Sequence, residues 1–342
     1  MFGNLFSALF SLKKVGIVDA IVRYPAIKIP LYRLFRSQRF AQSAVAQGLF
    51  QHAKERIAHW ENKPPKILIE PSSQCNGSCT TCPRVYLTRE KGIMDTPLYE
   101  KIVNQVAQVG IRTITLTGFG EPLLDPDFLK KIRIAERLGI DIFFFTNAIL
   151  LTESLSEALL ASQNLVQINL SVGGSNFKEY CLERRYASEN VNARARENIK
   201  RLCALKKEKK SRTKINIQPV YPPESIADSL RIRRYWMEMK PDSVDGNIRH
   251  SFANNQMGVT PGYYAYVPCK QLWDAMLILW DGRVAMCCED VNGRHIIGDL
   301  GKQTLKEVIS GARLRKLRRL HLEGQRNQIS TCRQCDVFSF WY

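Results

Sequence analysis

The chain has no long apolar segment and few acidic side chains for its number of basic ones. No apolar run approaches the roughly 20 residues of a membrane-spanning helix, so no spanning segment is predicted. Asp and Glu number 32 against 50 Lys and Arg, a formal net charge of +18. Such an excess is typical of a solvated basic surface, an anionic partner or an anionic membrane face. The basic residues are scattered and lack interleaved aromatic residues, so we predict no nucleic-acid partner.

The ten cysteines do not form the evenly spread framework of a disulfide-bonded secreted protein. They fall in two groups, with Cys181 and Cys203 apart, and no secretory signal with a small-residue cleavage site precedes them. We therefore expect a reducing, cytoplasmic location and metal ligation by the grouped thiols. A position at the inner membrane face would follow if residues 1–40 bind lipid.

Residues 1–63 are a segment of their own by composition, with ten Lys or Arg against three Asp or Glu. Apolar residues recur there at helical spacing, and we expect Pro25 and Pro30 to break the run. The segment is predicted to be a basic amphipathic helical extension. Either residues 1–40 contact a membrane surface, or the helices cover the bottom of the next domain or a dimer contact.

Apolar strands alternate with amphipathic helices from Lys66 to His250. The alternation favours an α/β fold with a parallel sheet, and six strand–helix units are too few for an eight-fold barrel. The predicted strands are 67–69, 113–116, 140–145, 166–170, 214–219 and 243–248, and the predicted helices are 96–109, 126–138, 152–162, 187–208 and 224–239. We predict three domains: 1–63, 64–250 and 251–342.

The stretch around which the chain is organised carries three cysteines, Cys75, Cys79 and Cys82, in a C-x3-C-x2-C spacing after the first strand. Cysteine thiolates are the usual ligands of iron–sulfur clusters. Three thiolates leave one iron of a [4Fe–4S] cluster open to a reaction partner, as at a catalytic rather than a structural metal site. A zinc knuckle fits the spacing, but no fourth Cys or His stands nearby to complete it.

This motif, followed by Thr117-Gly-Phe-Gly-Glu-Pro122, resembles the radical S-adenosylmethionine (SAM) superfamily. The resemblance runs from about Lys66 to the C-terminus. It implies a partial (β/α)6 TIM-like barrel with its chemistry at the carboxyl ends of the strands. It also implies that the open iron chelates SAM and that the reduced cluster cleaves SAM to a 5′-deoxyadenosyl radical.

Further SAM contacts follow from the same resemblance. Glu121 stands where the family holds the SAM ammonium, and Arg184 or its neighbour Arg185 where the SAM carboxylate is paired. Gly173 stands where relatives usually carry an acidic residue, so that contact is missing or supplied elsewhere. The other predicted cofactor-binding residues, on the glycine-rich element and the strand ends, are Gly118, Gly120, Thr146, Asn147, Asn169 and Ser171.

A second cysteine group lies in the C-terminal part. Its separations of 18, 45 and 3 residues and the hairpin around Gly282 resemble the SPASM and shorter twitch modules of radical SAM aminocyclitol and sugar dehydrogenases. The resemblance implies one auxiliary [4Fe–4S] cluster with no open iron, next to which Cys288 is unassigned. A structural zinc site is the alternative. The four predicted ligands are Cys269, Cys287, Cys332 and Cys335.

Three reactions stay open on the sequence. The first is oxidation of an H–C–OH carbon in a sugar-like or aminocyclitol-like metabolite, because a second cluster can accept the electron left after hydrogen abstraction. Arg249 and His250 are candidate bases for the hydroxyl proton, and His has the more suitable pKa. The alternatives are epimerisation of a sugar or peptide centre, with Cys288 as hydrogen donor, and modification of a ribosomal peptide. A non-enzymatic iron–sulfur carrier would make Glu121 and the barrel incidental.

The predicted cofactors are therefore two [4Fe–4S] clusters and SAM. The predicted partners are a small-molecule substrate, anionic or lipid-linked in keeping with the net charge, and an external one-electron reductant of the flavodoxin or ferredoxin type.

Overall fold

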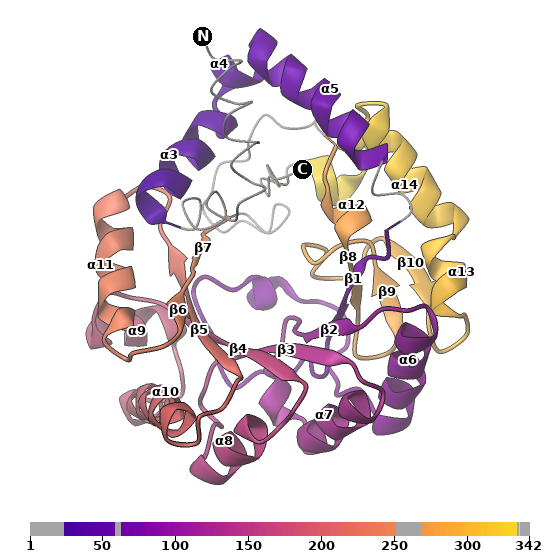
Figure 1. Ribbon diagram of the computed structural model, residues 1–342. Helices are drawn as coiled ribbons and strands as arrows, with labels where there is room; N and C mark the ends of the chain where they lie inside the picture. The colour runs from indigo at the N-terminus through magenta and orange to yellow at the C-terminus, as the bar shows by residue number, and fades with distance from the viewer. Residues whose placement is uncertain (1–23, 59–62, 251–267, 334, 336–342) are drawn as a thin grey trace.

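The computed structural model of the chain describes residues 24–58, 63–250, 268–333 and 335. Five parallel strands lie side by side in sequence order: β1 (Lys66–Ile69), β2 (Thr113–Leu116), β3 (Asp141–Thr146), β4 (Leu165–Val172) and β5 (Lys214–Tyr221). Figure 1 shows them as a curved sheet that does not close into a barrel. The predicted partial barrel is confirmed.

The sixth predicted strand is wrong as a single element. The structure has two short strands instead, β6 (Ser243–Val244) and β7 (Asn247–Ile248), and each pairs in parallel with β5. Gly246 separates them at a point where a Cβ atom would lie 2.3 Å from the Pro219 carbonyl oxygen. A side chain has no room at that approach, so a glycine fits where the strand is interrupted.

The helices that follow the strands cover the outer face of the sheet. Side-chain caps set several of their starts: Asp95, Thr152 and Ser188 each accept the backbone N–H three residues on. Their bounds agree with the prediction to within two residues, although α9 was not predicted. They are α6 (Thr96–Gln108), α7 (Phe128–Arg137), α8 (Glu153–Leu160), α9 (Phe177–Arg184), α10 (Glu189–Glu208) and α11 (Ile226–Met237).

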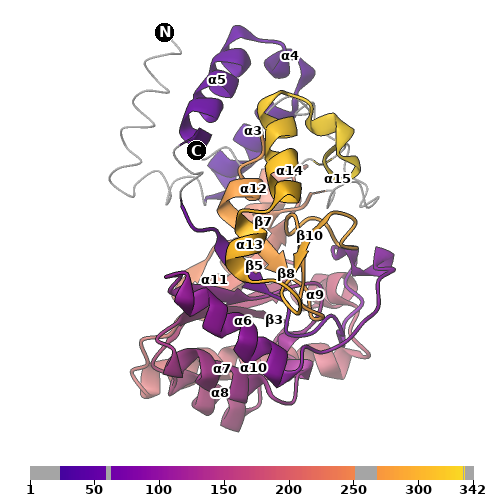
Figure 2. The same cartoon turned by 90° about the vertical axis from the view of Figure 1, so that its right-hand side faces the viewer.

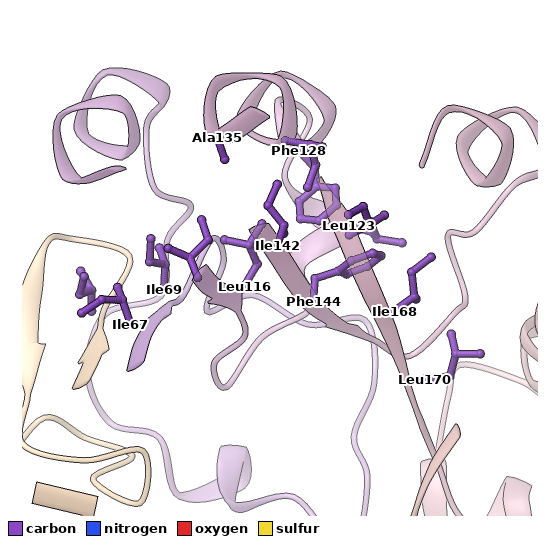
Figure 3. Packing of buried hydrophobic residues seen from close by; sticks show 14 of the residues in the cluster. Ile67, Ile69, Leu116, Leu123, Phe128, Ala135, Ile142, Phe144, Ile168 and Leu170 are labelled. Atoms are coloured by element: carbon purple, nitrogen blue, oxygen red, sulfur yellow. The ribbon is translucent and has the colours of Figure 1, made fainter. Parts of the chain in front are cut away.

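The hydrophobic core lies between the sheet and these helices. Alternate strand residues such as Ile142 and Phe144 are fully buried, as expected of strands with helices packed on one face. Figure 3 shows strand side chains meeting Phe128 and Ala135 of α7, and the Phe128 and Phe144 ring centroids are 5.1 Å apart. This packing holds the carboxyl ends of the strands in register.

The C-terminal part joins the same sheet. Strands β8 (Ala275–Ile278) and β9 (Arg283–Ala285) form the predicted antiparallel hairpin, and β10 (Ile296–Asp299) pairs with β9. β8 also pairs in parallel with β1, a pairing that the sequence did not reveal. Short helices complete this part: α12 (Gln271–Asp274), α13 (Leu305–Ile309), α14 (Ala312–Leu322), η3 (Arg326–Gln328) and α15 (Ser330–Arg333).

The described N-terminal residues form three helices: α3 (Pro25–Arg36), α4 (Gln38–Ala41) and α5 (Ala44–Ala58). The predicted break at Pro25 agrees with the start of α3 there, whereas the predicted break at Pro30 is wrong. Pro25 occupies the first turn, where its missing N–H costs nothing, and Pro30 lies inside α3. The rest of the apolar run, in residues 1–23, lies outside the described residues.

Side-chain contacts place α3 beside the carboxyl end of β5 and the link between β6 and β7, not at the bottom of the barrel. Lys28 Nζ donates to the Gly246 carbonyl oxygen at 2.9 Å, and Arg33 Nε donates to that of Pro223 at 2.7 Å. Figures 1 and 2 show α5 continuing towards α14 of the C-terminal part. No helix within the described ranges is long and apolar enough to span a membrane.

Candidate functional site

A cleft of about 620 Å³ opens at the carboxyl ends of β2, β3 and β4. Its concave shape and converging polar groups are those of a small-molecule or cofactor site. Ten of the predicted site residues line it: Cys75, Cys79, Cys82, Gly118, Gly120, Glu121, Thr146, Asn147, Ser171 and Arg184. Residues from five separate stretches of the chain therefore converge on this cleft.

The glycine-rich loop packs against the backbone that leads into Cys75. Glu121 N–H donates to the Gln74 carbonyl oxygen at 2.7 Å. A Cβ atom on Gly120 would lie 2.1 Å from the Ser72 carbonyl oxygen, so only glycine permits this approach. The loop and the cysteine motif are thus held as one unit.

The Glu121 carboxylate is buried but hydrogen-bonded. Oε1 accepts from Thr146 Oγ1 at 2.7 Å and from Leu123 N–H at 3.2 Å, and Oε2 accepts from Asn147 N–H at 2.7 Å. Burial raises the pKa of Glu121 to about 7, against the lowering effect of these hydrogen bonds. Oε2 keeps the capacity to accept another hydrogen bond, as the ammonium of a ligand requires.

A Glu121→Gln variant is expected to bind SAM about 10- to 150-fold more weakly, because a hydrogen bond to a charged group contributes about 1.5–3 kcal/mol. The wild-type affinity should rise as the pH increases through about 7, since the carboxyl group ionises there. The variant should lack this rise. Equilibrium binding of SAM to the reconstituted protein between pH 6 and pH 8 (roughly one unit either side) measures both effects.

Exposed Glu100 on α6 offers a matched control, because its carboxylate pairs with exposed Arg137 and does not line the cleft. Glu100→Gln should bind SAM as the wild type does. Equal SAM affinity of wild type and Glu121→Gln at every pH would contradict the ammonium-binding assignment.

Asn147 bridges the strand end and the cysteine motif. Its Nδ2 donates to Asn76 Oδ1 at 2.7 Å and lies 4.0 Å from Cys75 Sγ, while its Oδ1 accepts from Ile149 N–H. The side chain is thus a second link, besides Glu121, between β3 and the cysteines.

The structure separates the two neighbouring arginines. Arg184 is buried, lines the cleft and places Nη1 3.7 Å from Cys79 Sγ. Arg185 is exposed and has the left-handed backbone conformation (φ 45°) that ends α9. Only Arg184 can therefore meet an anionic group in the cleft.

Two strand-end positions differ from the others. Asn169 is buried outside the cleft lining, and its Oδ1 accepts from Gln167, Asn216 and Gln218. At Gly173 a Cβ atom would lie 1.9 Å from Glu183 Oε2. The Glu183 carboxylate, which also accepts from Gly174 N–H at 3.1 Å, therefore occupies the place of the acidic side chain that Gly173 lacks.

A buried ion pair that no sequence motif marks lies beneath the cleft. Glu70, directly after β1, holds Oε1 2.6 Å from Arg89 Nη2 and also accepts from Phe119 N–H. Its Oε2 accepts from Trp280 N–H at 3.3 Å, and Arg89 Nε donates to the Val291 carbonyl oxygen. One carboxylate thereby joins β1, the glycine-rich loop and the C-terminal hairpin.

The second cysteine group lines a cavity of about 350 Å³ in the C-terminal part. Around it lie all four predicted ligands, Cys269, Cys287, Cys332 and Cys335, together with Glu289, His321 and Arg326. Cys288 is not among the lining residues. Within the described ranges no three His, Cys, Asp or Glu side chains stand close enough to hold a single ion.

The thiols of both groups are held in environments that disfavour free thiolates. Burial raises the pKa of Cys75 to about 11 and that of Cys332 to about 12, and it raises the pKa of Cys287 well above its usual range. Iron ligation displaces the thiol proton, so the cluster itself provides the charge compensation that these sites lack. The donor sets thus fit iron–sulfur clusters in both places.

Of the three remaining candidates, His250 and Cys288 lie near the second cavity and Arg249 lies away from it. His250 Nε2 is 3.2 Å from Glu289 Oε2, and its Nδ1 is 3.1 Å from the Ile248 carbonyl oxygen. Cys288 Sγ is 3.7 Å from Glu289 Oε1. Arg249 instead pairs with exposed Glu224 at 2.8 Å. Glu289, which the sequence did not single out, therefore connects His250 with the wall of the second cavity.

Comparison with known families matches both halves of this arrangement. The model of the Radical SAM superfamily matches residues 69–232, and that of the SPASM iron–sulfur cluster-binding domain matches residues 269–336. The chain belongs to the radical SAM superfamily and carries a SPASM domain. Its cofactors are accordingly SAM with a [4Fe–4S] cluster, and an additional iron–sulfur cluster in the SPASM domain.

Individual relatives are distant. The chain is 23% identical over 279 residues to the SAM-dependent 2-deoxy-scyllo-inosamine dehydrogenase of Niallia circulans, covering 80% of this chain and 93% of that enzyme. It is 25% identical over 223 residues to a tungsten-containing aldehyde ferredoxin oxidoreductase cofactor-modifying protein of Pyrococcus furiosus, covering 64% of this chain and 56% of that protein. The chain thus spans about half the length of the second relative.

Solved structures show the same fold. BtrN, in a crystal structure with AdoMet and 2-DOIA, superposes with a TM-score of 0.58 at 19% identity, over 80% of this chain and 92% of that one. Streptococcus suis SuiB, bound to the precursor peptide SuiA, also gives a TM-score of 0.58 at 18% identity, over 84% and 74%.

Proposed function

We propose that this protein oxidises an H–C–OH carbon of a hydroxylated small molecule, such as a sugar or an aminocyclitol, to a carbonyl. The carbon loses a hydrogen atom, the hydroxyl loses a proton, and the one electron that remains passes to the auxiliary cluster. SAM and the reduced cluster, when bound, supply the radical that takes the hydrogen atom. The chain's own residues bind SAM, fix the substrate and provide the route for the proton and the electron.

The observation that carries this proposal is the second cavity with its four thiols. Four thiolates leave no iron open, which suits electron transfer rather than substrate chelation. Because β8 pairs with β1, the strands beside this cavity and those beside the cleft that holds Cys75, Cys79 and Cys82 form one sheet. The relation to a SAM-dependent dehydrogenase over 80% of the chain favours the same class of reaction.

His250 is the better placed of the two proposed bases. It follows β7 at the carboxyl end of the sheet, and Glu289 faces its Nε2 from the wall of the auxiliary cavity. A carboxylate at this position stabilises the imidazolium that forms when the ring accepts a proton. Arg249 is held by Glu224 and stays charged, so it does not serve as a base.

Epimerisation is the second candidate, and Cys288 is the observation that favours it. Its thiol is a fifth cysteine beside four ligands, and burial raises its pKa well above the usual range, so it stays a thiol with a hydrogen atom to give.

Peptide modification ranks third. The described part of residues 1–63 is helical and contributes no strand for a peptide to pair with.

A Cys288→Ala variant distinguishes the first two reactions. If the protein is a dehydrogenase, we expect carbonyl formation within about two- to threefold of the wild-type rate, because no step of the oxidation uses this thiol. Cys181→Ala, on α9 and away from both cavities, is the matched control. Loss of product in Cys288→Ala but not in Cys181→Ala would favour the epimerase.

The proposal is tested by anaerobic turnover with 2-deoxy-scyllo-inosamine and a panel of cyclitols, sugars and their phosphates, each deuterated at the reacting carbon. We expect one deuterium in 5′-deoxyadenosine for each product, and a product lighter than its substrate by two hydrogen atoms. A product one mass unit lighter than the deuterated substrate, in which a solvent hydrogen has replaced the deuterium, would contradict oxidation. An external one-electron reductant and a membrane-surface contact of residues 1–40 stay predictions.

A further inference from the structure

His321, in the last turn of α14, is a fully buried histidine on the wall of the auxiliary cavity. Its Nδ1 accepts a hydrogen bond from the backbone N–H of Cys269 at 2.9 Å. Its ring also meets Trp273 of α12 edge to face, with centroids 6.4 Å apart. The imidazole is therefore held in one orientation beside a predicted cluster ligand.

The hydrogen bond to Nδ1 fixes the tautomer of the ring. A nitrogen that accepts from a backbone N–H has its lone pair engaged and carries no proton, so in the neutral imidazole the proton is on Nε2. Among the described residues Nε2 has no hydrogen-bond partner, although it is buried. Leaving a buried donor unpaired costs about 1–3 kcal/mol, so a partner from outside the chain is expected.

A second polar group in the same cavity has the same need. Thr331 Oγ1 lines the cavity, is buried and has no partner within the described part of the chain. Both groups face a space walled by Cys269, Cys287, Cys332 and Cys335. Apart from the Glu289 carboxylate, which faces His250, the acceptors that such a space offers are the sulfurs of the cluster and its thiolates.

We propose that His321 donates a hydrogen bond through Nε2–H to a sulfur of the auxiliary cluster, and that it thereby raises the reduction potential of this cluster. Hydrogen bonds to the sulfurs disperse negative charge and favour the reduced state. This positioning role for His321 rests on the auxiliary cluster and not on the identity of the substrate. It would make the cluster a better acceptor for the electron that oxidation releases.

Redox titration followed by EPR tests the proposal in the full chain with Cys75, Cys79 and Cys82 changed to alanine, so that only the auxiliary cluster is observed. In this background His321→Leu and His321→Asn should both shift the midpoint potential to more negative values. Asn keeps an acceptor for Cys269 N–H, and its shorter side chain does not reach the Nε2 position, so it separates loss of the Nε2–H donor from loss of local structure. His295→Leu is the matched control, because His295 bonds Ser330 outside the cavity.

An unchanged potential in His321→Asn at full iron content would overturn the proposal. If the variants lose iron, pulsed EPR of the parent protein with ¹⁵N-labelled histidine provides the test instead. A hyperfine coupling from one histidine nitrogen to the reduced auxiliary cluster is expected, and its absence would overturn the proposal. An auxiliary site that shows no reduction in the titration would also overturn the proposal. Neither result depends on whether the substrate is oxidised, so the proposed function is tested separately.

Discussion

Changing Cys75, Cys79 and Cys82 together to alanine is expected to abolish 5′-deoxyadenosine formation while leaving the C-terminal cluster in place. The three thiols line one cleft with Glu121 and Arg184, and no other cysteine lines it. The iron content after anaerobic reconstitution should therefore fall from about eight to about four per chain. Iron and sulfide analysis, with chromatography of the SAM products, measures both changes.

A Cys181→Ala/Cys203→Ala double variant is the control for loss of cysteine as such. Neither thiol lines a cluster cavity, so this variant should keep about eight irons and its SAM cleavage. If the triple variant contained no iron at all while the wild type held about four, the C-terminal cysteines would not bind a cluster. An oxidation that uses a second cluster would then be contradicted.

Breaking the Glu70–Arg89 ion pair should cause a large loss of stability. Both side chains are almost completely buried, at 0% and 4% exposed, and Glu70 also accepts two backbone N–H groups. Glu70→Ala leaves the Arg89 guanidinium buried without its partner, for which about 3–5 kcal/mol is expected. Denaturant unfolding of the reconstituted protein under anaerobic conditions measures the change.

The matched control is the exposed pair of Glu100 and Arg137, whose removal by Glu100→Ala should cost less than about 1 kcal/mol. A Glu70→Leu/Arg89→Met double variant should recover much of the loss, since no charge remains buried. Because Glu70 joins the glycine-rich loop to the hairpin at Trp280, the single variant should also weaken SAM binding. Equal losses of stability in Glu70→Ala and Glu100→Ala would contradict the role assigned to the Glu70–Arg89 ion pair.

Local signals in the sequence predicted the barrel strands, most of their helices and both cysteine groups. Cys75, Cys79 and Cys82 follow one strand, and Glu121 follows the next. Parallel strands bring residues at such positions together at one edge of the sheet. Helix starts carry the same kind of signal, as at Asp95 and Ser188. These features depend on residues a few positions apart, so a single sequence contains them.

Features that depend on distant partners were not predictable. Glu70 meets Arg89 and Trp280, and β8 pairs with β1, across more than 200 residues in the latter case. Pro30 was expected to end a helix, but α3 continues because it docks through Lys28 and Arg33 onto the carboxyl end of β5 and the link between β6 and β7. Such tertiary contacts override local preference, and no residue pattern announces them.

His321, Glu183 and Glu289 belong to the same group. Each acts at a site formed by other elements: His321 at Cys269, Glu183 at Gly173 and Glu289 at His250. A lone histidine or glutamate is ordinary in sequence. Only the fold shows which of them is buried beside a thiol or a strand end.

EPR of the fully reduced protein with and without SAM tests the central claim most directly, namely one cluster with an open iron and one with four thiolate ligands. We predict two reduced-cluster signals, of which only the one missing from the Cys75/Cys79/Cys82 variant changes when SAM is added. A signal from the C-terminal cluster that also responds to SAM, or a single signal in the wild type, would contradict this account.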